Sequence, residues 1–463
     1  MDNNSVLNPL ANIERIHYLD QLRAYALLAG ILMHASYTYG YIIQDIWYLT
    51  DQTCSKVITQ GFLFLHLFRM PVFYLIAGFF ANYIYQKRGV KGFLKHRLKR
   101  IGLPFIIFTP LVLIAFNLLI VLILFYLPVE KMSASLKPIA PAVKAQIESY
   151  FGKKSGSLNN VKDANTPNIP ENKSLNPDKS AESNVASKVS APNPDGIQKT
   201  NTADSSKVQQ SGPQITQHLW FLYYLLLFCL CAALFQMFSH PFITGIFTKL
   251  FTSPVYLWLI PLFMIPSLYY IDIPWGAPMH IIPRLWPFGY FGIFFLLGWH
   301  FFYHQDYPDK FKKHFRVMIV FSIIASAYFI YFSPEYIISR SNEPAKETMA
   351  SILFSQKMVL VILEAYLSLF LTIISLILGK RYLNFSNKYV RFISDSSYWI
   401  FIIHFPLVTY IQVFLVTAPF SGYLKLIISS AILFFIGLIT YRYIVRYTFI
   451  GTMLNGKRIR GME

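Results

Sequence analysis

Arg23 and His34 are the first residues of the chain whose types and spacing point to chemistry. They lie eleven positions apart in the segment 19–40, which is otherwise apolar enough to cross a bilayer. Ionisable groups are costly in such a segment and usually mark a functional site. On one helix they would lie about 16 Å apart along the axis, on roughly the same face. The alternative is a snorkelling arginine, held by Asp20 one turn earlier, and a structural histidine.

Four further candidates are ionisable side chains inside apolar segments. His66 and Arg69 are neighbours on one helical face, and Arg69 lies near the middle of its segment, where snorkelling is difficult. Glu364 would be protonated there unless paired, and His404 lies in a segment near the end of the chain. These four residues are candidate site residues, and a structural polar network is the alternative interpretation.

A basic segment, 86–100, contains seven Lys or Arg residues and no acidic residue. The positive-inside rule places such a loop in the cytoplasm. If the segment is helical, Arg97 and Arg100 share a face, and guanidinium groups pair bidentately with phosphate. The segment is therefore either a phosphate-binding site or a topology signal that contacts lipid head groups.

About ten apolar segments must position these residues. The chain has 463 residues, of which 55% are hydrophobic and only 14% charged, whereas soluble proteins average about 25% charged residues. We therefore predict an all-α polytopic membrane protein, because a spanning backbone must satisfy its own hydrogen bonds. The predicted transmembrane helices lie at roughly 19–40, 59–83, 102–127, 218–238, 250–270, 286–303, 315–332, 357–378, 396–416 and 423–447.

Residues 130–215 differ in composition from the rest of the chain. They are rich in Ser, Asn, Pro, Lys and Asp and nearly free of aromatic residues, so they cannot bury enough apolar surface to fold. We predict a long disordered extracytoplasmic linker. It divides the chain into 1–129, with three transmembrane helices and the basic cytoplasmic loop, and 216–463, with seven helices and a basic cytoplasmic tail. Counting spans outward from 86–100 places both termini in the cytoplasm.

Composition also excludes several classes of function. The formal net charge is +19, but the charge lies between apolar segments, so no nucleic-acid partner is expected. The three Cys residues show no disulfide or metal-ligand spacing, so no metal is expected. Residues 451–457 fit most of a nucleotide-binding loop, but Arg458 occupies the Ser/Thr position and no strand precedes it.

Together these motifs resemble the membrane-bound acyltransferase family 3. Three patterns of that family have counterparts here: Arg-x10-His in the first span, Arg-x-x-Arg before the third span, and Ser-x-Tyr…His in the final spans. The counterparts are Arg23 and His34; Arg97 and Arg100; and Ser396, Tyr398 and His404.

Within the family, the chain is most similar to the glucan biosynthesis protein C branch. The similarity lies in 15–25, 66–80 and 218–222 and is weak through 240–390. That branch is implicated in O-succinylation of periplasmic glucans. The insert at 130–215 is much longer than the usual loop of the branch.

The resemblance implies an enzyme of the inner membrane that transfers an acyl group to a glycan. The donor would be a cytoplasmic acyl-CoA, succinyl-CoA in that branch, with no permanently bound cofactor. The acceptor would be a hydroxyl of a periplasmic glucan or related glycan. Two alternatives stay open: a transporter or exporter of a polar polymer, and an O-acyltransferase acting on lipopolysaccharide or another surface polysaccharide.

The candidate residues divide into two groups under this interpretation. A neutral histidine would act as general base, and an arginine would stabilise the oxyanion of the tetrahedral intermediate. The predicted catalytic group is His34, His66, Arg69, Glu364 and His404. The predicted donor-binding group is Arg23, Arg97 and Arg100.

Overall fold

The computed structural model describes residues 16–41, 47–132, 136–138, 140–145, 214–238, 258–271, 277–342 and 347–456. Within these ranges the chain is helical and contains no β-strand, only isolated bridges, which confirms the predicted all-α class. The chain forms two units, Met1–Pro141 with Gln214–Glu463, and Ala142–Pro213. Most of the predicted linker, 146–213, lies outside the described residues, so its predicted disorder stays a prediction.

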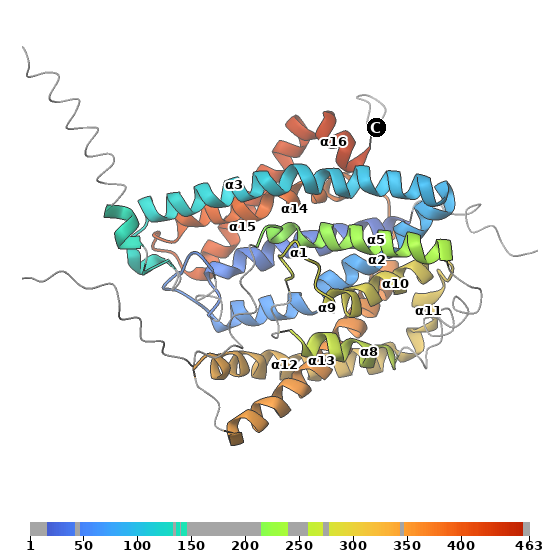
Figure 1. Cartoon of the computed structure of the whole chain (residues 1–463), viewed down its shortest axis with the longest axis horizontal. Coiled ribbons are helices and arrows are strands. Elements are labelled where there is room, and N and C mark those ends of the chain that lie inside the picture. The colour runs from blue at the N-terminus through green and yellow to red at the C-terminus, as the bar shows by residue number, and fades with distance from the viewer. Residues whose placement is uncertain are drawn as a thin grey trace, which may run out of the picture. The chain divides into compact units, whose positions relative to one another are not determined.

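The helices before the linker include the one that carries Arg23 and His34. They are α1 (His17–Ala35), η1 (Ser36–Thr38), α2 (Lys56–Arg97), η2 (Leu98–Gly102), α3 (Leu103–Tyr126) and η3 (Val129–Lys131). Those after it are η4 (Gln217–Leu219), α5 (Trp220–Phe238), α8 (Ile260–Tyr269), α9 (Trp286–Gly289), α10 (Phe291–Phe301), α11 (Tyr307–Lys310), η5 (Lys312–His314), α12 (Phe315–Asn342), α13 (Glu347–Tyr382), α14 (Lys388–Leu415), α15 (Gly422–Thr440), η6 (Tyr441–Val445) and α16 (Phe449–Asn455). Of all these helices, α3 from before the linker and α5 and α12 from after it run roughly parallel (Figure 1).

Each predicted transmembrane segment overlaps a helix, although 250–257 of the segment 250–270 lie outside the described residues, and the count of ten is not confirmed. In the described part of the chain, six helical runs are long and apolar enough to cross a membrane. One of them, Lys56–Tyr126, contains both α2 and α3, whereas α8 and α10 are shorter apolar helices. The helix α1 is not among the six, and it carries Asp20, Arg23 and His34. The chain is a multi-pass membrane protein.

The helix α1 lies in the core of the unit formed by Met1–Pro141 and Gln214–Glu463. It packs against α2, α13, α14 and α15, so its apolar side chains are covered on several sides. Buried Ile31 and Ala35 meet Ile400 and Val408 of α14 and Leu433 of α15 in one apolar cluster. This packing fixes the height of α1 relative to α14, which sets the positions of their polar residues.

A hydrogen-bond network fixes the same two helices where α1 ends. Gln412 of α14 donates to the Ala35 carbonyl at 2.7 Å and accepts from the Thr38 hydroxyl at 2.7 Å. The Trp47 indole donates to the same hydroxyl at 3.2 Å. Buried polar groups satisfied in this way hold one geometry, because any shift would leave them unpaired.

Glycines bring α2 and α10 into close contact. A Cβ atom on Gly298 would lie 1.7 Å from the Leu75 carbonyl oxygen, and one on Gly78 would lie 2.0 Å from that of Phe295. Neither distance leaves room for a side chain, so glycine at these two positions permits the close packing of α2 against α10. Asn82 adds a hydrogen bond of 2.7 Å to the Trp299 carbonyl.

The basic segment predicted as a loop is helical. The helix α2 runs through it to Arg97, interrupted at Gly89, where φ is +61°. A π-helical turn, η2, then leads into α3. Lys, Arg and Gln are good helix formers, so a strongly basic composition indicates exposure rather than irregular backbone. The helical backbone brings Arg97 and Arg100 to one site.

Candidate active site

Two buried histidines from opposite ends of the chain form one hydrogen bond. His34 Nδ1 of α1 lies 2.6 Å from His404 Nε2 of α14. The two rings stack with their centroids 4.8 Å apart. His34 is 7% exposed and His404 is fully buried, so the pair is shielded from water.

The partners of His404 assign the protons of the pair. His404 Nδ1 lies 2.5 Å from the Phe401 carbonyl oxygen, which can only accept, so Nδ1 carries the proton. In a neutral ring His404 Nε2 is then the acceptor, and His34 Nδ1 must donate to it. His34 Nε2 therefore holds a lone pair. That nitrogen has the character of a general base.

A third histidine, His218, joins the pair. Its Nε2 donates to the Ile402 carbonyl at 3.0 Å, and its ring meets that of His404 edge-on at 5.0 Å. The Ile402 carbonyl is available because the residue four positions later, Pro406, has no backbone N–H to donate. His218 Nδ1 is buried without a partner among the described residues. Sequence reasoning noted the segment 218–222 but left His218 out of the site.

Arg69 brings a positive charge to the cluster. It is 5% exposed, and its Nη2 lies 3.2 Å from the Met33 sulfur. A Cβ atom on Gly30 would lie 2.8 Å from Arg69 Nη1, so the guanidinium lies against α1 one turn before His34. The charge of Arg69 acts electrostatically on His34, His66 and His404. The structure thus brings four of the five predicted catalytic residues into one region.

Glu364 lies elsewhere. It is 3% exposed on α13, and its electrostatic neighbour is Tyr290, between α9 and α10. Its Oε2 is buried without a hydrogen-bond partner among the described residues. No described contact joins Glu364 to the histidine cluster, and its predicted catalytic role stays a prediction.

Aromatic rings cover the histidine pair on the side of residues 47–55. The Phe405 ring lies 4.5 Å from that of His34, and Trp47 lies 5.0 Å from Phe405. Tyr37 meets Trp47 at 5.0 Å and Phe62 at 5.5 Å. A water-poor environment strengthens electrostatic interactions with a reacting group.

A basic cavity lies toward the other end of α1. It has a volume of about 430 Å³, and the three predicted donor-binding arginines, Arg23, Arg97 and Arg100, line it. Arg97 is 9% exposed, and its Nε and Nη2 are buried without partners among the described residues. Unpaired guanidinium N–H groups in a cavity suit phosphate oxygens.

One face of α1 connects the cavity to the histidines. Arg23 and Leu27 line the cavity, Gly30 meets Arg69, and His34 bonds His404. These four positions fall on one helical stripe, over about 16 Å between Arg23 and His34. Between the two ends lies an aromatic layer in which Phe221 meets Phe73 at 5.2 Å and Phe401 at 4.6 Å.

Comparison with known proteins places the chain in a family. A model described as an acyltransferase domain matches residues 16–442, so the chain belongs to this family, acyltransferase family 3. The resemblance to this family that the sequence motifs indicated is therefore confirmed. No solved structure matches the chain.

The curated relatives are similar over one part of the chain. Glucans biosynthesis protein C of Escherichia coli (strain SMS-3-5 / SECEC) is 33% identical over 105 residues, which is 23% of this chain and 26% of that protein. The protein of the same name from Salmonella paratyphi B is 34% identical over 97 residues, 21% of this chain and 24% of that one. The match thus spans about a quarter of each relative's length.

Proposed function

We propose that this protein transfers an acyl group from a cytoplasmic acyl-CoA to a hydroxyl of a periplasmic glucan or related glycan. The observation that carries the proposal is the single face of α1, with a basic cavity at Arg23 and a hydrogen-bonded histidine pair at His34. One end suits an anionic donor and the other suits proton transfer. A long, flexible CoA arm would connect them along α1.

The donor would bind through its phosphates in the basic cavity. Arg97 and Arg100 come from the turn between α2 and α3, and Arg23 comes from α1. Arg23 is also paired with Asp20 at 3.7 Å, so it keeps one carboxylate while facing the cavity. Because guanidinium groups bind phosphate bidentately, three of them in one cavity favour a polyphosphorylated ligand.

The chemical step would occur beside His34. Nε2 of His34 would take the proton of the acceptor hydroxyl while the hydroxyl oxygen attacks the thioester carbonyl carbon. The tetrahedral oxyanion would be stabilised by Arg69. Collapse would break the carbon–sulfur bond, and the proton on His34 would pass to the departing CoA thiolate. Ester and free thiol are the products, and no oxidant or metal enters the balance.

Three details of the proposal, namely the acceptor, the donor and the membrane placement, rest on similarity to relatives and on the charge of the basic segment. They do not rest on the geometry of the site. The glucan acceptor is supported by the name of the curated relatives. A succinyl donor is implied by the branch that the sequence resembles. Placement in the inner membrane with cytoplasmic termini is supported by the seven Lys and Arg residues in 86–100.

The direct test is transfer by the purified protein. Succinyl-CoA and acetyl-CoA carrying a radiolabelled acyl group are incubated with the protein in detergent and a glucan oligosaccharide. We expect label in the glycan only when protein, donor and glycan are all present. Mass spectrometry of periplasmic glucans and surface polysaccharides from cells with and without the protein then identifies the natural acceptor. Export of a polymer without any acyl mass difference would contradict the proposal and favour a transporter.

A further inference from the structure

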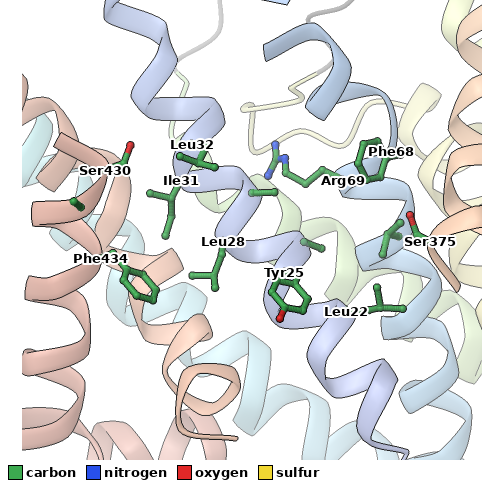
Figure 2. Close-up of a pocket in the computed structure, with 14 residues that line it drawn as sticks. Leu22, Tyr25, Leu28, Ile31, Leu32, Phe68, Arg69, Ser375, Ser430 and Phe434 are labelled. Atoms are coloured by element: carbon green, nitrogen blue, oxygen red, sulfur yellow. The ribbon is translucent and has the colours of Figure 1, made fainter. Parts of the chain in front are cut away.

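A second cavity lies on the opposite side of α1 from the basic cavity. Its volume is about 530 Å³. Figure 2 shows α1 as its floor, with α15 on one side and α2 and α13 on the other. We call it the α1 groove; its lining includes Leu22, Tyr25, Leu32, Arg69, Ser430 and Phe434.

The groove has apolar walls and is open to the surface of the helices. Leu22 and Ile31 of α1 and Val72 of α2 are buried, whereas Tyr25 and Leu32 are about half exposed, at 48% and 49%. Because α13 and α15 each contain a candidate membrane span, side chains exposed between them would face lipid in a bilayer. From Leu22 to Leu32 the groove follows α1 for about 15 Å, half of a hydrocarbon core of about 30 Å.

One end of the groove carries a positive charge. Among the described residues that line it, Arg69 is the only charged one, and Figure 2 shows its guanidinium beside Leu32. Arg69 Nε is buried without a hydrogen-bond partner in the described part of the chain, and so is the hydroxyl of Ser430 on the facing helix. Among the described residues no carboxylate forms an ion pair with Arg69. A buried cation without a counter-ion is costly, so this end is complementary to an anion.

We propose that the α1 groove binds one hydrocarbon chain of an anionic membrane lipid, with the lipid phosphate paired to Arg69. At about 15 Å the groove is long enough to hold much of one lipid chain, and its charge is complementary to that of the phosphate. Arg69 has five N–H donors, so it can hold a phosphate while facing the histidine cluster. The lipid head group would lie beside His34, because Arg69 meets α1 at Gly30, one turn before it.

The test is lipid binding by the full-length protein, measured by native mass spectrometry after delipidation in detergent. Phosphatidylglycerol and diacylglycerol of the same chain length, the second of which lacks the phosphate, are added in turn. We expect one tightly bound phosphatidylglycerol, preferred over diacylglycerol by about tenfold, as one charge-assisted phosphate contact provides. Arg69→Gln should abolish this preference while leaving binding of the hydrocarbon chain.

Bulky substitutions separate the groove from the rest of the lipid-facing surface. Ala431→Trp places an indole at the exposed rim of the groove, and Ala29→Trp places one on its floor. Ile114→Trp is the control, because Ile114 is 57% exposed on α3 and lies outside the groove. We expect Ala431→Trp and Ala29→Trp to weaken phosphatidylglycerol binding about tenfold, and Ile114→Trp to leave it unchanged.

If Ala29→Trp fails to fold, the exposed Ala431→Trp still decides the question. Equal binding of the two lipids by the wild-type protein would overturn the proposal, and so would unchanged binding by Ala431→Trp. Neither result depends on acyl transfer, so failure here is distinguishable from failure of the proposed enzymatic function.

Discussion

His34 and His404 share a hydrogen bond of 2.6 Å although 370 positions separate them in the chain. The Phe401 carbonyl fixes the proton on His404 Nδ1, and this in turn makes His34 Nδ1 the donor. The reactive lone pair is therefore on His34 Nε2. In this arrangement His404 positions the base, and His34 is the residue that would touch the acceptor.

The first prediction separates an orienting role of His404 from a packing role. His404→Leu removes the acceptor of His34 Nδ1–H, so we expect transfer to fall about 10²–10⁴-fold, the range typical of a lost base. His404→Gln retains an acceptor oxygen near the position of Nε2, so it should recover much of the rate. The rate at saturating donor should change while the KM for acyl-CoA does not. Equal loss in both variants with a changed KM would show that His404 only packs.

The second prediction concerns the basic cavity. Arg97→Ala should weaken CoA binding about tenfold, because it removes a charge-assisted contact to phosphate, and Arg97→Lys should restore part of it. Lys91→Ala is the matched control, since Lys91 belongs to the same basic segment but does not line the cavity. Isothermal titration at low and high salt measures the effect. Equal losses for Arg97→Ala and Lys91→Ala would indicate only a general electrostatic attraction.

The sequence predicts the parts of the site that depend on one helix. The spacing of Arg23 and His34 places both on one face of α1, because helical periodicity is local. The contact between His34 and His404 depends on how α1 packs against α14, which no local pattern encodes. The role of His218 could be predicted only in part. Pro406 shows that the Ile402 carbonyl has no backbone N–H donor within the helix, but it does not identify His218 as the donor.

The basic segment illustrates a different limit. Its composition predicts where 86–100 lies relative to the membrane, but not its backbone, and the structure shows a helix broken only at Gly89. Likewise, the polarity of Glu364 predicted a functional site, whereas its packing places it near Tyr290. Charge in an apolar segment marks a residue for attention without identifying its partner.

The third prediction is the topology. In a variant with Cys54, Cys229 and Cys231 replaced by Ser, Ser180→Cys should react with an impermeant thiol reagent in intact spheroplasts. Lys313→Cys should react only after lysis, because counting spans from 86–100 places the segment between the predicted helices 286–303 and 315–332 in the cytoplasm. The expectation follows from the excess of Lys and Arg in the predicted inside segments. Labelling of Ser180→Cys only after lysis would reverse the predicted orientation.

The fourth prediction concerns pH and the ion pairs of Asp309, between α10 and α12. Hydrogen bonds from Lys312 and Lys380, at 2.6 and 2.5 Å, hold the pKa of Asp309 below its usual value. A lowered pKa stabilises the folded state above the unfolded pKa of about 4, and this stability is lost as pH falls through the folded pKa. Since Asp309 is 41% exposed, solvent screening limits the effect to about 1 kcal/mol or less.

Melting curves in detergent from pH 3 to pH 7 measure this contribution. Asp309→Asn should remove part of the acid sensitivity and lower the melting temperature slightly at pH 7. Asp306→Asn is a suitable control, because Asp306 pairs only with Lys310 among the ion pairs of the described residues. An unchanged pH profile in Asp309→Asn would contradict the prediction.

The division of roles along α1 is the central claim, and single-turnover transfer beside donor binding tests it most directly. His34→Ala and Arg23→Ala are compared with the wild-type protein in detergent, at unchanged melting temperature. The account predicts that His34→Ala loses transfer by about 10²–10⁴-fold while it binds acyl-CoA normally, since it removes a proton acceptor and not an anchor. Arg23→Ala should instead weaken donor binding. Transfer by His34→Ala at a rate near that of the wild-type protein would contradict the account.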